Sequence, residues 1–129
     1  DGHRLSKKLL GDLRDFRLGR CSMHLQPNSW FHFLSDHVIT FSAFPINDHQ
    51  TLVRTTWLVA DDAVEGVDYD VEKLTHTWKQ TNLQDKQFVE LCQQGVRSPM
   101  YEQGPYMKSE YQVEAFINWY TLRMREYMA

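Results

Sequence analysis

The sequence predicts an α+β domain in which an antiparallel β-meander is followed by a long helix and a C-terminal helix. Two observations lead to this prediction. Segments rich in aromatic and β-branched residues alternate with turn residues over residues 20–60. Apolar residues then recur at steps of three and four over residues 68–94 and 109–128, which is the spacing of one helix face. We therefore expect helices packed on one face of a curved sheet, an arrangement that often holds a cavity between sheet and helix.

Composition limits the classes of function. The chain has 129 residues, of which 42% are hydrophobic and 13% aromatic, enough for one globular domain with a core of large rings. A net charge of −3 without a basic stripe argues against a nucleic-acid partner, and no apolar run reaches the roughly 18 residues of a membrane span. Two cysteines form no disulfide framework, so a cytoplasmic location is expected.

The start of the chain is highly charged. Residues 1–18 alternate charges with leucines and contain two glycines, so they are predicted to be an irregular lead-in. The first residue is Asp1 instead of Met, and we expect residues 1–129 to be a piece of a longer protein.

The meander is predicted to contain four strands. Turn chemistry separates them at Pro27-Asn28, at Ser35-Asp36 and at residues 47–50. The expected strands cover residues 20–26, 29–34, 37–46 and 51–60. In the last of these, apolar residues lie on both faces, so both faces should be partly covered.

Local signals bound the two helices. Asp68 or Asp70 can cap the helix over residues 68–94, and Gly95 is a natural C-terminal stop. A loop with two prolines follows, and Ser109 opens a possible capping box for the helix over residues 109–128. The apolar stripe of this second helix, whose purpose should be core packing, comprises Val113, Phe116, Ile117, Tyr120, Met124, Tyr127 and Met128.

One acidic residue interrupts the apolar stripe of the long helix. Asp85 lies seven residues after Trp78 and seven before Cys92, so it is predicted to point inward with them. Burying a carboxylate costs several kcal/mol unless it is paired, protonated or bound to a metal. Asp85 is therefore either a structural acid, paired with Arg54 or a helix end, or a metal ligand with Asn82 as a hydrogen-bond partner one turn earlier.

Two histidines offer a partner set for such a carboxylate. His32 and His37 are separated by four residues across a tight turn, and with Asp85 they would complete a two-histidine, one-carboxylate triad for Fe(II). The alternative is that Asp36 simply solvates them. Cys21 and His24 form half of a metal site at best.

Large rings are the other candidate binding feature. They can line a cavity and hold a quaternary ammonium group by cation–π attraction, although plain core packing is the more frequent role of such rings. The rings are Trp30, Phe31, Phe33, Phe41, Trp57 and Trp78. Cys92 fits a small core residue.

Several stretches, taken together and in order, resemble a known family. They include Pro-Asn-Ser-Trp at 27–30, Asp-His at 36–37, Thr-Trp-Leu-Val at 56–59, Asp-Ala-Val-Glu-Gly-Val-Asp-Tyr-Asp at 62–70, Thr-Asn-Leu-Gln-Asp at 81–85, Gln-Gly-Val at 94–96, Ser-Pro at 98–99, Gly-Pro-Tyr at 104–106 and Phe-Ile-Asn-Trp-Tyr at 116–120. The chain resembles the C-terminal part of the catalytic domain of Rieske-type non-haem iron oxygenases, the ring-hydroxylating dioxygenase α-subunit family. The resemblance is greatest to the branch that demethylates glycine betaine and related quaternary amines. It implies half of a helix-grip, START-like domain.

The resemblance implies a role for Asp85. The family binds mononuclear Fe(II) with two histidines of an upstream Asp-x2-His-x4-His motif and one late aspartate, which Asp85 matches. His32 and His37 copy the spacing, but Ser29 stands where the motif has Asp, so the ligand role is not carried onto them. Asn82 is the implied partner of the ligand, and Trp30, Phe41, Trp57 and Trp78 are the candidate substrate pocket.

The resemblance also implies cofactors and partners outside this chain. A [2Fe–2S] domain held by two cysteines and two histidines would receive electrons from a reductase or ferredoxin. The iron would then use O2 to oxidise a small organic substrate, in a full-length protein that forms a homotrimer. The chain alone is expected to be inactive. Two rival interpretations stay open: a metal-free helix-grip module that binds a small ligand, and a structural or assembly domain.

Overall fold

The structure is a computed structural model that describes residues 3–129. Its contacts divide the chain into two compact units, with the boundary between Lys86 and Gln87 inside the long helix. In chain order the elements are the 3-10 turn η1 (Phe16–Leu18), the strands β1 (Cys21–Leu25), β2 (Ser29–Phe33), β3 (Val38–Asn47) and β4 (Gln50–Leu58), the helix α1 (Val71–Val96), the 3-10 turn η2 (Lys108–Glu110) and the helix α2 (Tyr111–Met128). The predicted α+β class is confirmed.

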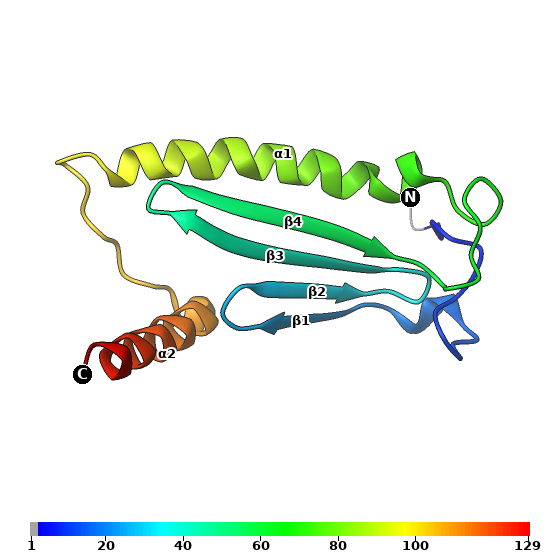
Figure 1. Ribbon diagram of the computed structural model, residues 1–129, viewed down its shortest axis with the longest axis horizontal. Coiled ribbons are helices and arrows are strands. Elements are labelled where there is room, and N and C mark those ends of the chain that lie inside the picture. The colour runs from blue at the N-terminus through cyan, green and yellow to red at the C-terminus, as the bar shows by residue number, and fades with distance from the viewer. Residues whose placement is uncertain (1–2) are drawn as a thin grey trace. The chain divides into compact units, whose positions relative to one another are not determined.

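The four strands form one antiparallel sheet in the order β1-β2-β3-β4, which is the predicted meander (Figure 1). Directly opposed residues share a face, so His32, Ile39 and Trp57 line up across β2, β3 and β4. In the same way Trp30, Phe41 and Thr55 form the neighbouring row on this face. The observed strands differ from the predicted ranges by one or two residues at their ends.

The tight turn between β2 and β3 carries the most buried polar group of the sheet. Ser35, Asp36 and His37 are all about 5% exposed or less. The Asp36 carboxylate lies 2.8 Å from Nδ1 of His37 and accepts hydrogen bonds from the backbone N–H groups of Leu5 at 2.7 Å and Ser6 at 3.1 Å. Burial alone raises the pKa of Asp36, but these hydrogen bonds outweigh it and bring the pKa down to about 2.

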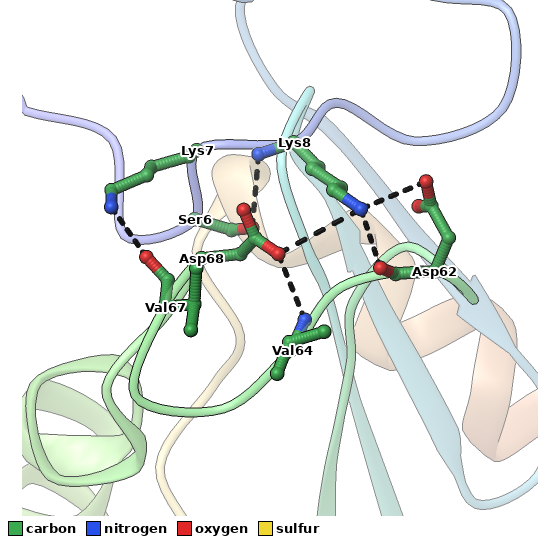
Figure 2. A network of polar contacts seen from close by, with 7 residues as sticks. All are labelled: Ser6, Lys7, Lys8, Asp62, Val64, Val67 and Asp68. Atoms are coloured by element: carbon green, nitrogen blue, oxygen red, sulfur yellow. Dashed lines mark hydrogen bonds and ion pairs between the residues drawn. The ribbon is translucent and has the colours of Figure 1, made fainter.

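The lead-in is irregular over residues 3–15, and it is attached to the loop that precedes α1 (Figure 2). Lys8 Nζ lies 2.9 Å from the Asp62 carboxylate and 3.7 Å from that of Asp68, and it also donates to the Asp62 carbonyl. Lys7 donates from its ammonium group to the Val67 carbonyl and from its backbone N–H to the Asp68 carbonyl at 2.8 Å. These contacts hold the lead-in beside the start of the helix.

The hydrogen bonds at the start of α1 show which of the two predicted capping residues caps the helix. Asp70 caps the helix, because its carboxylate accepts the backbone N–H of Lys73 at 2.9 Å and its carbonyl accepts that of Leu74. Asp68 instead accepts the backbone N–H of Val64 at 2.9 Å and faces Lys8. The helix therefore begins at Val71, three residues later than predicted.

Two other predicted helix signals are wrong. Gly95 does not stop α1 and has no left-handed backbone; the helix continues to Val96 and ends just before Ser98, whose α conformation is disfavoured by the proline that follows. Ser109 does not cap α2. The Glu110 carboxylate reaches back to the backbone N–H of Met107 at 2.6 Å, so the chain turns two residues earlier and passes through η2.

The first half of α1 packs on the sheet face that carries the His32 and Phe41 rows. Trp78 stacks on the His32 imidazole with ring centroids 5.1 Å apart and meets the Phe41 ring edge-on at 4.9 Å. Leu74 is 4% exposed, and with Val38 and Ile39 it forms the buried apolar core of the described residues. This small core is what holds the helix to the sheet within the first unit.

The predicted core role of α2 is not realised within the described residues. Phe116 contacts the rings of Trp119 and Tyr120 along the helix, but no residue of α2 is buried. Tyr127 is 88% exposed. Among the residues described, 3–129, no helix is both long enough and apolar enough to cross a membrane.

Asp36→Asn should lower the free energy of unfolding by about 2 kcal/mol, because the depressed pKa of the carboxyl measures how strongly its neighbours stabilise the charged form. Urea denaturation at neutral pH measures the effect. Asp12→Asn, at an exposed position of the lead-in, is the matched control and should leave the stability unchanged. Equal stability of the two variants would contradict the structural role of Asp36.

The same carboxyl makes stability depend on pH in the acid range. Its pKa is about 2 in the folded chain against a usual 3.8, so its contribution is complete above pH ~4 and is lost as the pH falls through about 2. The stability gap between the wild type and Asp36→Asn should therefore narrow between these two pH values. Denaturation curves at pH steps across this range test the prediction, and a constant gap would exclude it.

Trp78→Ala should lower the free energy of unfolding by about 2–3 kcal/mol, since the half-buried indole makes two ring contacts that hold α1 to the sheet. Tyr127→Ala removes a comparable ring at an exposed site and should cost less than about 0.5 kcal/mol. Thermal and urea denaturation of both variants supply the comparison. A Trp78 variant as stable as the Tyr127 control would show that these contacts carry no packing energy.

Candidate functional site

The candidate site is the face of the sheet that α1 covers within the first unit. The four predicted pocket rings come from this sheet face and from α1: Trp30, Phe41 and Trp57 lie on the sheet face, and Trp78 of α1 contacts Phe41. His32 completes the group, because its ring lies 5.1 Å from that of Trp78 and 5.7 Å from that of Phe41. Together these side chains form an aromatic wall on the sheet face that α1 covers. Of the four predicted pocket residues, Trp78 lines the cavity described below, whereas Trp30, Phe41 and Trp57 are not among its lining residues.

A polar pair lies next to this wall. The Asn82 side chain donates from Nδ2 to the Thr55 hydroxyl of β4 at 2.8 Å, and both residues are partly buried. Because Asn82 lies one turn beyond Trp78, the two side chains fasten consecutive turns of α1 to the sheet. Asn82 was predicted to be a hydrogen-bond partner of Asp85, but its side chain bonds to Thr55 instead.

Asp85 follows one turn later on the same side of α1. Contrary to the expectation of burial, it is exposed, and its carboxylate makes no hydrogen bond or ion pair with any residue in the range 3–129. The predicted alternative of a pair with Arg54 is also wrong, because that guanidinium lies over the Phe44 ring. The cost of burying a charge therefore does not arise for Asp85 in this chain.

A cavity of about 170 Å³ lies between the sheet and the first turns of α1. Its apolar lining consists of Leu5, Leu34, Ile39 and Leu74. Its remaining walls come from Arg20, His32, His37, Thr77 and Trp78. The predicted cavity between sheet and helix is thus present.

Both histidines of the predicted pair line this cavity, but each already has a partner on Nδ1. His32 Nδ1 lies 2.8 Å from the Ser22 hydroxyl, and His37 Nδ1 lies 2.8 Å from Asp36. Burial, helped by the positive charge of Arg20, lowers the pKa of His32. Asp36 does more than solvate the pair, since it fixes the ring of His37.

The two histidines do not join Asp85 in a metal site. Within residues 3–129 no group of three or more histidine, cysteine, aspartate or glutamate side chains is arranged to hold a metal ion. Cys21, Cys92 and His24 are exposed, so Cys92 is not the small core residue that was expected. His24 instead stacks on Trp30, with ring centroids 4.9 Å apart.

The remaining pocket candidates differ in their surroundings. Trp30 is 39% exposed at the β1 side of the sheet. Trp57 is half-buried, and its indole N–H is buried without a hydrogen-bond partner among the described residues. A buried donor without a partner costs roughly 1–3 kcal/mol. A further group that accepts a hydrogen bond from the indole N–H of Trp57 would remove this cost.

The sequence did not predict the full role of two residues of the site. Asp36 was interpreted as a turn residue that could solvate the two histidines, and its bonds to Leu5 and Ser6 were not foreseen. Arg20 was placed only at the start of a strand, and nothing local in the sequence marks it as a cavity residue. Both roles depend on contacts between segments that are far apart in the chain.

Comparison with known proteins gives a consistent result. Residues 3–126 match the family model described as ring hydroxylating alpha subunit (catalytic domain). The glycine betaine monooxygenase oxygenase subunits of Pseudomonas aeruginosa strains UCBPP-PA14 and PAO1 are 46% identical to this chain over 125 residues. That of Chromohalobacter salexigens is 43% identical over 122 residues.

The matches cover 96% and 94% of this chain but only 29% and 27% of the relatives. The chain thus spans under a third of the length of these curated relatives. The match of the family model to residues 3–126 confirms the resemblance that the motifs suggested. The chain belongs to the family of ring-hydroxylating alpha subunits, and the matched part lies in their catalytic domain.

Proposed function

We propose that this chain is part of the oxygenase component of a Rieske-type non-haem iron oxygenase that uses O2 to oxidise a small organic substrate. The favoured reaction is the N-demethylation of a quaternary amine such as glycine betaine. One observation carries this proposal: 46% identity over 96% of the chain to oxygenase subunits whose name states glycine betaine monooxygenase. A reductase or ferredoxin would supply electrons to the full-length protein, a homotrimer in the cytoplasm.

Asp85 is the proposed iron ligand of this chain. Its carboxylate is exposed and has no protein partner among the described residues, and a carboxylate oxygen is a usual donor to Fe(II) in facial sites with open positions. The described residues contain no group of three ligands, so they fit one ligand of the iron and not the whole site. Two histidines from outside the described residues would complete it.

The [2Fe–2S] cluster belongs, in this proposal, to another domain. Such a cluster needs two cysteines and two histidines close together, and the described residues contain no group of even three such ligands. When bound, the mononuclear iron would supply the activation of O2 for oxidation of a substrate C–H bond. The residues considered next would bind the substrate and orient the helix that carries Asp85.

Asn82 and the aromatic wall have distinct proposed tasks. The Asn82–Thr55 hydrogen bond fixes α1 to β4 one turn before Asp85, and so it holds the ligand's helix at a set distance from the sheet. The faces of Trp78 and Phe41, with Trp57 and Trp30 farther along the sheet, would attract a quaternary ammonium group by cation–π interaction.

A metal-free module that binds a small ligand is the second candidate. The cavity of about 170 Å³ favours it, because the cavity is formed by residues of this chain alone and needs no metal. The identity to oxygenase subunits favours the first proposal over this one.

Asp85→Ala in the full-length protein should remove one iron of about three per chain and leave the spectrum of the [2Fe–2S] cluster intact. The reason is that the exposed carboxylate is the only ligand that this chain is proposed to give. Metal analysis and visible spectroscopy on wild type and variant test it. Asp12→Ala, at an exposed position of the lead-in, should keep all the iron.

Normal iron content and turnover in Asp85→Ala would exclude the proposed ligand. A folded full-length protein that binds no iron would instead support the metal-free module.

A further inference from the structure

The cavity between the sheet and α1 has walls of two kinds. Some of its lining residues are apolar, among them Leu34, Ile39 and Leu74. Others are polar, among them Arg20, Thr77 and His32. A ligand that suits both kinds needs a short apolar part and a polar end group.

The positive charge of Arg20 at the cavity has no ion-pair partner among the described residues. Arg20 is exposed and makes no hydrogen bond or ion pair with any residue of the part of the chain that the structure describes. No acidic side chain lines the cavity. Asp36 is a buried acid bonded to the lining residue His37, and both of its oxygens already accept hydrogen bonds, so they are not available to Arg20. Among the lining residues, Arg20 therefore carries a permanent charge that has no ion-pair partner among the described residues.

The charge of Arg20 acts on the cavity wall. It adds to the effect of burial in lowering the pKa of His32, which lines the same cavity. This favours a neutral imidazole there and argues against a cation inside this cavity, because the cation would lie near the unpaired guanidinium of Arg20. The quaternary ammonium group of the proposed substrate would instead lie against Phe41, Trp57 and Trp30, which do not line the cavity.

We propose that this cavity binds a small aliphatic monocarboxylate. Arg20 would pair with the carboxylate, because the planar guanidinium fork matches two carboxylate oxygens. Thr77 would donate a further hydrogen bond, and the alkyl chain would lie against Leu34, Ile39 and Leu74. The volume, about 170 Å³, corresponds to five or six waters of roughly 30 Å³ each, which suits acids of about two to five carbons.

The test is equilibrium binding of acetate, propionate and butyrate to the full-length protein, measured by calorimetry and by line broadening of the 13C-labelled acids. Each added methylene should tighten binding up to about fourfold, because the apolar wall buries it. Arg20→Gln should weaken butyrate binding at least tenfold, and Arg20→Lys should weaken it less, because lysine keeps the charge and loses the fork. Thr77→Val should weaken it by a few-fold.

Arg17→Gln is the matched control, since Arg17 is an exposed arginine of η1 that already pairs with Asp15 at 3.1 Å. It should bind butyrate like the wild type. Circular dichroism establishes that each variant is folded.

Three outcomes would overturn the proposal: no saturable binding, the same affinity in Arg20→Gln as in the wild type, or no dependence on chain length. Equal weakening by Arg17→Gln would show general attraction of anions to the surface and would also overturn it. Trimethylammonium chloride, a cation of similar size, should not compete. None of these readouts requires turnover, so the proposal and the oxygenase function can fail separately.

Discussion

The rest of the first unit depends on the hydrogen bonds of the Asp36 carboxylate. It joins the turn between β2 and β3 to Leu5 and Ser6, which are about 30 residues earlier in the chain. Once these are fixed, Lys7 and Lys8 reach the loop that leads into α1, and Leu5 becomes part of the cavity wall. A buried carboxylate is stable here because three donors, two backbone N–H groups and Nδ1 of His37, bond to its oxygens. The Asp36 carboxylate thus fixes the position of the lead-in and the orientation of the His37 ring. Both contribute lining residues to the cavity.

The sequence predicts the meander well because its signals are local. Alternating residues and short turns determine which neighbours pair, and an antiparallel pairing of consecutive strands needs nothing else. The ends of α1 show the limit of such signals. Glycine often ends helices, but α1 continues past Gly95 to Val96. The helix ends there because Pro99 disfavours the helical conformation at Ser98. Asp68 and Asp70 are equally good caps by type, and only the position of Lys8 separates their roles.

The exposure of Asp85 shows what helical periodicity can and cannot predict. A step of three or four residues places side chains on one face of a helix, and Trp78 and Asn82 do share the sheet-facing side. Periodicity carries no information on whether anything covers that face. Phe88 is 67% exposed for the same reason. The candidate site follows this division: alternation along the strands predicts that Phe41 lies on one sheet face with its opposed partners, whereas the roles of Arg20 and Asp36 depend on contacts between distant segments.

The proposed iron ligand and the cavity make different demands on the same helix. A facial iron site needs an open carboxylate that its own chain leaves unpaired, and Asp85 meets this condition because it is exposed. The cavity lies two to three turns earlier, at Trp78 and Leu74, and it needs the opposite: a helix held firmly against the sheet. The Asn82–Thr55 hydrogen bond lies between the two. It fastens α1 at the last point where the described residues bury it, so the turn that carries Asp85 begins from a fixed position while its carboxylate stays free to bind.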